Sequence, residues 1–423
     1  MSANVPDPSR ILSIQSHVVS GYVGNRAATF PLQLLGWDVD VANTVQFSNH
    51  TGYGRWGGLR FDSDHLDQLF DGLDKNGLLR YSRMLTGYMP SAAVVTNVLN
   101  LVKKLRARTP AQARQQQQQQ HGGRNGADDG ASGEDDDDDD DDDEGGLIYL
   151  LDPVMGDIGR GMYVAPEVLP VYKQMLPYST IITPNQFEAQ VLTGLEVTDL
   201  SSLKRVIWTL HHVHGVPHVI ITSVALPQGE LEKIGATATL PNGQTAMLQV
   251  GSSYRTRSTA RNSTANATAT APPDGPDDLD VWMIQFPEVD GYFSGVGDLF
   301  AALTLGRFRP QETAQERAAT ADGANGVKSL TPIARAAELA IASLQGILAR
   351  TSETIDRLEA EEARQSPSAA TATNGKVQGE VQVEAEDPAE ARVNRMRKRE
   401  LRIVQSRDEI ERPEVVYRAR WLP

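Results

Sequence analysis

The stretch Ser294-Gly295-Val296-Gly297-Asp298 lies between an apolar run at residues 282–286 and the sequence LFAAL at residues 299–303. The first run predicts a strand, and the second predicts a helix that starts at the glycines. Two glycines let the backbone turn tightly, and the free amides at a helix start favour a negatively charged ligand. A carboxylate in that first turn suits proton removal from a hydroxyl while the amides hold a transferring phosphoryl group. The pattern favours a small-molecule kinase, and the alternative is an ordinary helix start.

Outward from this turn, strand-like and helix-like segments alternate along the chain. Predicted strands cover residues 11–15, 39–43, 84–86, 147–151, 180–182, 218–222, 236–240, 246–250 and 282–286. Predicted helices cover residues 25–35, 63–76, 91–105, 166–176, 186–192, 200–212 and 332–354. This alternation predicts an α/β fold with a mainly parallel sheet and helices on both faces. Ligands of such sheets lie at the carboxyl ends of strands, and most polar motifs of this chain fall there.

Four segments differ in composition from the rest: residues 106–146, 252–278, 312–328 and 360–391. The first contains six consecutive glutamines and a long acidic run. These segments offer too little apolar surface to fold by themselves, and a stable core tolerates long surface loops. We therefore expect one domain over residues 10–423 that carries four disordered insertions.

Charge and composition exclude several classes of protein. The formal net charge is −15, but eleven of the 55 acidic residues lie at residues 134–144, and the other 44 nearly balance 40 basic residues. Nothing in this balance favours binding to nucleic acid or to a membrane surface. The absence of cysteine excludes disulfides and thiolate metal sites. Residues 1–10 lack a hydrophobic signal core and no apolar run is long enough to span a bilayer, so we expect a cytoplasmic protein.

Several tracts together resemble the pyridoxal kinase family of the ribokinase-like superfamily. In order they are SIQSH (13–17), GYVGN (21–25), VQFSNHTGY (45–53), LTGY (85–88), DPVMGD (152–157), TPNQFE (183–188), ITS (221–223), the glycine turn and LRIVQS (401–406). The order and approximate spacing of the tracts before LRIVQS match the family over about residues 10–310, LRIVQS is similar to the family's C-terminus, and the four insertions lie outside the resemblance. The resemblance implies a ribokinase-like α/β/α fold, ATP as phosphoryl donor, a B6 vitamer as substrate and a homodimer.

The resemblance also assigns the reacting groups. Asp298 is the implied general base that takes the proton from the alcohol. The amides of Gly295, Val296 and Gly297 are the implied anion hole for the terminal phosphoryl group. Family members often have a hydroxyl residue where this chain has Val296, which removes a side-chain contact but leaves the backbone donors.

The implied substrate pocket combines hydroxyl groups with flat or apolar walls. Its members are Ser16, Val23, Phe47, Thr51 and Tyr88, together with Gly297 and Asp298. Hydroxyls can address the ring nitrogen and phenolic oxygen of a pyridoxal ring, and the other side chains can pack on its faces. The alternative for Phe47 and Val23 is a place in the core. Trp56 and the glycines around it favour a flap beside this pocket, or an ordinary hairpin.

Asp152, Asn185 and Glu188 resemble the set that the family uses for Mg-ATP, with Asp152 and Glu188 on the metal. Magnesium keeps several waters, so a sparse set of acids suffices. The alternative is a capping box, in which Asn185 and Glu188 satisfy the start of the helix at residues 186–192.

The remaining implied contacts concern a monovalent cation such as K⁺ and the nucleotide. Asp157 and Thr183 resemble the family's cation surroundings, as does Thr222, which is placed with Ser223 on the nucleotide side. Val289 ends the stretch 286–289 that is expected to flank the adenine. The glycine-rich residues 155–162 are expected to form a lid over ATP. Four histidines at residues 211–218 are spaced poorly for a metal site.

Two alternatives stay open beside a pyridoxal kinase. A related ribokinase-like enzyme could phosphorylate a hydroxymethylpyrimidine or a sugar. A protein of the same fold could also bind a B6 vitamer without catalysis and use its insertions to recruit partners. Asp298, Asp152, Asn185 and Glu188 argue against the second alternative.

Overall fold

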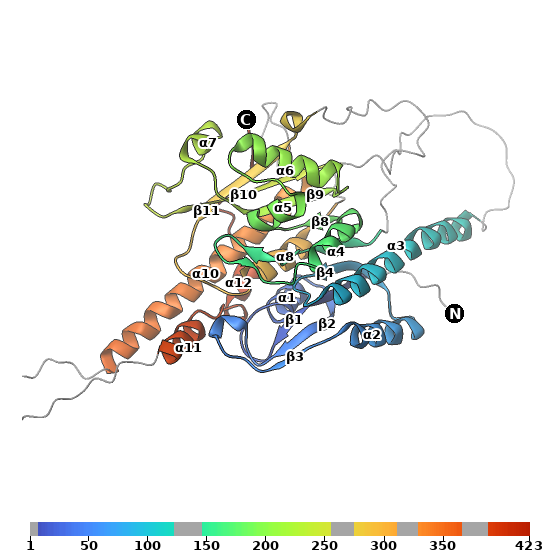
Figure 1. Ribbon diagram of the computed structural model, residues 1–423, viewed down its shortest axis with the longest axis horizontal. Coiled ribbons are helices and arrows are strands. Elements are labelled where there is room, and N and C mark those ends of the chain that lie inside the picture. The colour runs from blue at the N-terminus through green and yellow to red at the C-terminus, as the bar shows by residue number, and fades with distance from the viewer. Residues whose placement is uncertain (1–6, 122–145, 255–274, 311–328, 366–387) are drawn as a thin grey trace, which may run out of the picture.

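The computed structural model describes residues 7–121, 146–254, 275–310, 329–365 and 388–423. Its centre is a ten-stranded sheet with the order β12-β11-β10-β9-β8-β5-β4-β1-β2-β3 (Figure 1). The strands are β1 (Asp7–Val18), β2 (Asp38–Phe47), β3 (Gly58–Arg60), β4 (Tyr81–Thr86), β5 (Ile148–Leu151), β8 (Ile181–Ile182), β9 (His218–Val224), β10 (Ala246–Ser253), β11 (Val281–Pro287) and β12 (Arg420–Trp421). The five pairs from β2 to β9 are parallel and the outer pairs are antiparallel, so the predicted mainly parallel sheet is confirmed.

Helices cover both faces of the sheet because its strands are apolar on both sides. On β1, Ile11 points into one core and Leu12 and Ile14 into the other. One core includes α1 (Asn25–Leu34), α8 (Val296–Arg307), α10 (Pro332–Gln365) and α12 (Arg407–Glu411). The other includes α2 (Ser63–Lys75), α3 (Ala92–His121), α4 (Val168–Met175), α5 (Gln186–Thr193), α6 (Leu200–His212) and α7 (Gln228–Lys233). This arrangement confirms the predicted three layers.

The carboxyl ends of the parallel strands lie at one edge of the sheet, as does the end of β11, which runs antiparallel to β10 and therefore in the same direction as β9. The loops that leave this edge carry the predicted site residues. Between β5 and α4, a small hairpin of β6 (Gly156–Asp157) and β7 (Gly161–Met162) rises from the same edge. The predicted lid at residues 155–162 contains this hairpin.

The strand predicted at residues 236–240 is wrong. Both edges of β10 are occupied, by β9 and β11, so the sheet offers no place for another strand beside it. Residues 238–246 instead form a local turn, in which Thr239 and Thr245 make an isolated bridge. Helix α7, which lies just before this turn, was not predicted from the sequence.

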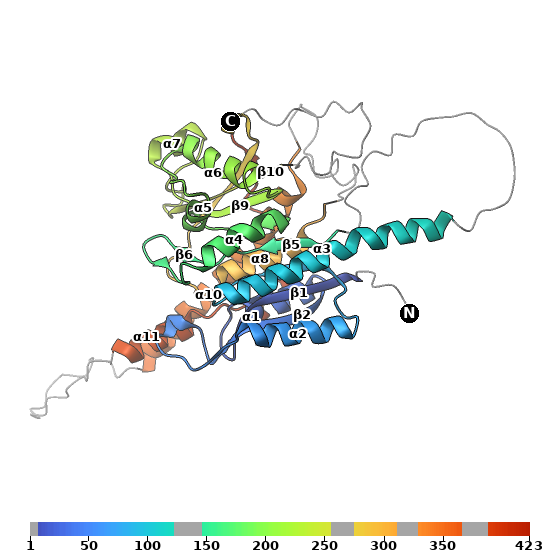
Figure 2. The same cartoon turned by 45° about the vertical axis from the view of Figure 1, so that its right-hand side comes forward.

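Regular structure extends into three of the predicted insertions. Helix α3 continues from the predicted end at residue 105 to His121 and projects beyond the body of the molecule (Figure 2). Helix α10 reaches Gln365, and α11 (Pro388–Lys398) starts before residue 391. Strand β10 and a short turn of helix at Pro276–Asp278 occupy the borders of the insertion at residues 252–278. A helix can extend beyond the apolar pattern that predicts it, because glutamine, glutamate, lysine and arginine are themselves good helix formers. The centres of all four insertions lie outside the described residues.

No helix among the described residues is long and apolar enough to cross a membrane.

Candidate active site

The glycine turn connects β11 to α8, as the sequence predicts. Gly295 precedes the helix with φ +84°, and a Cβ at this position would lie 1.9 Å from the carbonyl oxygen of Tyr22. Both the left-handed backbone and this close approach require glycine. The loop after β1 is thereby packed directly against the turn before α8.

Asp298 joins the same two segments. Its Oδ2 accepts a hydrogen bond of 2.7 Å from the backbone N–H of Gly24, at the end of the loop after β1. Gly24 in turn lies over Ser16, since a Cβ on Gly24 would come within 2.4 Å of the Ser16 Oγ. Gly24 therefore brings the predicted base close to Ser16 of the predicted substrate contacts, although 282 positions of sequence separate Ser16 from Asp298.

Acidic side chains gather beside the turn. A Cβ at Gly297 would lie 4.0 Å from Oδ2 of Asp152, which follows β5. Burial raises the pKa of Asp298 above its ordinary value, and the Gly24 hydrogen bond partly offsets this. Burial, Glu188 and Asp298 together raise the pKa of Asp152 well above its ordinary value. Buried carboxylates that repel one another favour a cation between them or a positioned proton.

Asn185 and Glu188 form the capping box that the sequence left as an alternative. Asn185 Oδ1 accepts the Glu188 N–H at 2.9 Å, and Glu188 Oε2 accepts the Asn185 N–H at 2.9 Å. Glu188 Oε1 also accepts the N–H groups of Met155 and Gly156, at 2.9 and 3.4 Å. Burial raises the pKa of Glu188 to about 7, although these three N–H groups lower it. The pair thus ties the base of the lid to α5, and its predicted contact with Mg-ATP stays a prediction.

The residues predicted near a monovalent cation lie on neighbouring segments. Thr183 follows β8, and its buried hydroxyl has no hydrogen-bond partner among the described residues. The backbone N–H of Thr222 on β9 donates to the Pro184 carbonyl at 2.9 Å, which ties that strand to the Thr183 segment. Asp157 lies on β6 and accepts the Ile158 N–H. An unpartnered buried hydroxyl is compatible with a bound cation.

The lid hairpin reaches across to the loop before the glycine turn. The Arg160 guanidinium lies 4.0 Å from the ring centroid of Tyr292, a cation–π contact. Gly156 allows the hairpin to close, since a Cβ there would lie 2.3 Å from the Gly161 carbonyl oxygen. Val289 lies on the same loop as Tyr292 and packs against the core beneath it. Ser223 lies on β9, and its predicted role stays untested.

The apolar wall of the predicted substrate pocket is a separate small cluster. Phe47 is buried with Val18 and Val45, and the half-buried Val23 and Tyr88 pack against them. Trp56 lies beside Phe47, with ring centroids 6.4 Å apart. The loop after β1, the end of β2 and the loop after β4 thus meet in this cluster. The arrangement is compatible both with a core role and with a pocket wall.

Thr51 starts a 3-10 helix (Thr51–Tyr53) in the loop between β2 and β3, and it is exposed. Residues 48–57 of this loop, which include Trp56, are termed the flap.

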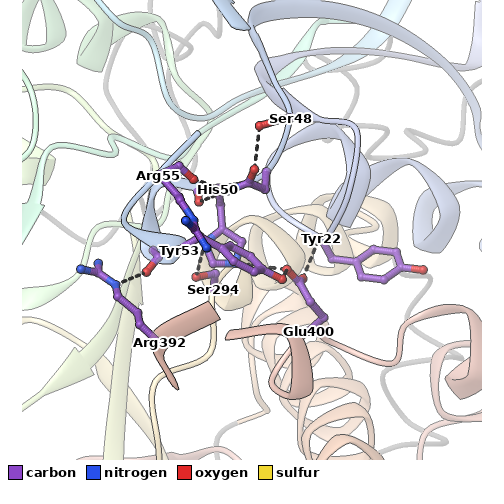
Figure 3. A network of polar contacts seen from close by, with 10 residues as sticks. Tyr22, Ser48, His50, Tyr53, Arg55, Ser294, Arg392 and Glu400 are labelled. Atoms are coloured by element: carbon purple, nitrogen blue, oxygen red, sulfur yellow. Dashed lines mark hydrogen bonds and ion pairs between the residues drawn. The ribbon is translucent and has the colours of Figure 1, made fainter. Parts of the chain in front are cut away.

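A polar network beside Thr51 was not predicted from the sequence (Figure 3). Its centre is Glu400, which lies just after α11, and its members on the flap are His50 and Tyr53. Ser294 joins it from the glycine turn. These residues lie in or beside the quoted tracts, but no local pattern marks a glutamate at residue 400 as a partner of residues 22, 50 and 53.

No group of three histidine, aspartate or glutamate side chains within the described ranges could by itself hold a metal ion. A cavity of about 350 Å³ lies between α10 and α11, away from Asp298, and Arg395, Lys398 and Glu362 are among its lining residues.

Comparisons with known proteins agree with this geometry. A family model described as phosphomethylpyrimidine kinase matches residues 143–270. The chain is 33% identical over 414 residues to pyridoxal kinase from Homo sapiens, with 97% of each chain covered. It is 38% identical over 301 residues to pyridoxal kinase from Sus scrofa, covering 70% of this chain and 74% of that relative. The solved structure of Leishmania donovani pyridoxal kinase with ADP and pyridoxamine matches with a TM-score of 0.62 at 27% identity, covering 98% of this chain and all of that one. The tracts, the fold and these matches together place the chain in the pyridoxal kinase family.

Proposed function

We propose that this chain transfers the terminal phosphoryl group of ATP to the 5′-hydroxymethyl group of pyridoxal, and also acts on pyridoxine and pyridoxamine. The observation that carries the proposal is the hydrogen bond from Gly24 to Asp298. It holds a half-buried carboxylate between the loop that carries predicted vitamin contacts and the turn whose amides are the proposed anion hole. Family membership supports the choice of substrate and donor.

The proposed reaction needs few protein groups. The alcohol oxygen attacks the terminal phosphorus, the bond from that phosphorus to the ADP oxygen breaks, and Asp298 takes the alcohol proton. The amides of residues 295–297 stabilise the charge on the transferring group. The lid excludes water that would otherwise compete with the alcohol. The product is pyridoxal 5′-phosphate, as in vitamin B6 salvage.

The residues fit a divalent cation. Asp152 is buried among acids whose mutual repulsion a cation would relieve, and Glu188 beside it is already oriented by three backbone N–H groups. A Mg²⁺ ion held with ATP phosphates and water at Asp152 would neutralise charge on the phosphates. Asp157, Thr183 and Thr222 are the proposed surroundings of a monovalent cation, for which the unpartnered hydroxyl of Thr183 is the supporting observation. The homodimer and the cytoplasmic location stay predictions.

The test is phosphate transfer from ATP to pyridoxal by the purified protein, with hydroxymethylpyrimidine and ribose as competing acceptors. We expect pyridoxal to be the preferred acceptor. Negligible turnover of every B6 vitamer would overturn the proposal, and a marked preference for hydroxymethylpyrimidine would favour the first alternative.

Asp298→Asn tests the base. A positioned base contributes roughly 10²–10⁴-fold, so we expect kcat to fall by about that factor while pyridoxal and ATP still bind. Asp290→Asn is the matched control, because Asp290 is exposed on the loop just before the turn. Wild-type kcat in the Asp298 variant would show that another group accepts the proton.

A further inference from the structure

Glu400 is a nearly buried carboxylate that the reaction above does not use. Its side chain is 11% exposed. Oε2 accepts the backbone N–H of Tyr22 at 3.0 Å, and Oε1 accepts the Tyr53 hydroxyl at 3.0 Å. Oε1 also lies 3.2 Å from Nε2 of His50. A Cβ on Gly21 would lie 2.5 Å from Oε1, so glycine at residue 21 makes room for this carboxylate.

The three partners of Glu400 come from the two loops that carry predicted substrate contacts. Tyr22 precedes Val23 and Gly24, and its carbonyl oxygen packs on Gly295. His50 and Tyr53 belong to the flap and flank Thr51. Figure 3 shows His50 and Tyr53 on one side of Glu400 and Tyr22 on the other, where the Tyr22 backbone makes the contact and its ring points away.

His50 extends the network to the glycine turn. Because a carboxylate only accepts hydrogen bonds, the His50 Nε2 that faces Glu400 carries the hydrogen. In the neutral ring Nδ1 is then an acceptor, and the Ser294 hydroxyl lies 3.3 Å from it. Glu400 thus selects the tautomer that lets Ser294, next to Gly295, donate to the flap.

The C-terminal segment holds the flap by further contacts. Arg392 Nε on α11 donates to the Gly52 carbonyl at 2.8 Å. A Cβ on Gly52 would lie 3.5 Å from Sδ of the buried Met396. Burial and Glu400 raise the pKa of Tyr53, so this hydroxyl stays a donor at neutral pH.

We propose that Glu400 is a positioning residue for the phosphoryl transfer: it holds the flap, the loop after β1 and the glycine turn in one arrangement around the vitamin. The proposal rests on the proposed function, because it concerns binding of the same substrate. It makes the segment after α11 part of the vitamin site. It also assigns the network to the vitamin side of the reaction and not to the nucleotide side, because its flap members flank Thr51 and the lid residues are absent from it.

Glu400→Gln is the main test. It keeps the side-chain shape and the oxygen that accepts the Tyr22 N–H, but it presents an NH₂ group to two other donors, the Tyr53 hydroxyl and His50 Nε2. We expect the KM for pyridoxal to rise roughly tenfold, with the KM for ATP within about twofold and kcat within about fivefold of wild type. Tyr53→Phe removes one of these contacts and should raise the same KM by a smaller factor. In the double variant, the KM for pyridoxal should rise by less than the product of the two single-variant factors. Both substitutions disturb the same contact between Glu400 and Tyr53.

Hydrogen exchange gives a readout that does not depend on activity. Amides of the flap should exchange faster in Glu400→Gln than in wild type, and amides of α6 should not change. Glu409→Gln is the matched control, because Glu409 lies nine residues from Glu400 and pairs with Arg350 away from the site. It should lower the melting temperature and leave both KM values unchanged.

The proposal is overturned if Glu400→Gln binds pyridoxal as wild type does, or if both KM values rise together with the loss of thermal stability. A wild-type protein that does not phosphorylate pyridoxal would instead refute the proposed function, and faster flap exchange would still support the network.

Discussion

Gly295 and Gly36 adopt nearly the same left-handed backbone, with φ of +84° and +85°, but their surroundings differ. A Cβ on Gly36 would meet nothing within 4 Å, whereas on Gly295 it would collide with the Tyr22 carbonyl. The two glycines therefore separate the cost of the backbone conformation from the cost of the close approach. At Gly295 both costs fall on the segment that forms the proposed anion hole.

Gly36→Ala should lower the free energy of unfolding by about 1–2 kcal/mol, the cost of a left-handed alanine, with kcat unchanged. Gly295→Ala should cost more stability and also lower kcat by about 10²-fold, because the turn must move away from Tyr22 by roughly 1 Å or more. Urea unfolding and steady-state kinetics measure the two effects. Equal kcat values in the two variants would contradict the proposed role of the turn.

Helix α8 is the element that carries the proposed base, and it is fixed at both ends. At its start the Asp298 carboxylate accepts the Gly24 N–H. At its C-terminal end, Arg83 on β4 donates to the carbonyl oxygens of Leu305 and Phe308, and the indole N–H of Trp37 donates to that of Gly306. The Arg83 guanidinium also stacks over the Trp37 ring at 4.4 Å. A cation at the C-terminal end suits the helix dipole as well as the unpaired carbonyls.

Arg83→Met should lower the free energy of unfolding by about 2 kcal/mol, because the Leu305 carbonyl loses the Arg83 donor and the Phe308 carbonyl keeps only Arg309. Arg83→Lys should lie between wild type and Arg83→Met, since it keeps the charge but donates from a single nitrogen. Burial lowers the pKa of Arg83 to about 9, so the side chain is still charged at neutral pH. Equilibrium unfolding in urea tests the order, and a methionine variant as stable as wild type would show that the carbonyls find other partners.

Across the whole molecule, the sequence predicted those elements and motif positions that a local pattern of residues encodes. Helix α6 has the predicted bounds, residues 200–212, because a strong apolar period follows an Asp199 cap. The motif residues at strand ends were also predictable, since a parallel sheet brings those ends to one edge. Glu400 was not, because its contact with Tyr22 spans 378 residues and no local pattern encodes such a pairing. Helix α11 was missed because its polar composition resembles that of the insertion beside it.

Two neighbouring histidines, His211 and His218, indicate how the stability of the whole fold depends on pH. His211 on α6 is fully buried, and its Nδ1 lies 2.6 Å from the Val216 carbonyl, so the neutral ring donates from Nδ1. Its Nε2 is buried without a hydrogen-bond partner among the described residues. Burial lowers the pKa of His211 to about 4, and burial and His211 lower that of neighbouring His218. Protonation would place a charge on a nitrogen that nothing solvates.

The sign of the effect follows from the two states. Between about pH 6.5, where an unfolded histidine titrates, and pH 4, the unfolded chain binds the proton and the folded chain does not. Stability is therefore fully present above pH 6.5 and is lost as the pH falls through this window. For His211 alone the loss at pH 5 is about 2 kcal/mol.

His211→Phe keeps an aromatic ring and removes the titration. It should be less stable than wild type at pH 7, since the Val216 carbonyl loses its donor, but its unfolding free energy should fall by about 2 kcal/mol less between pH 7 and pH 5. Urea unfolding at the two pH values measures this difference, and equal losses in both proteins would mean that His211 is protonated as easily in the folded chain as in the unfolded one.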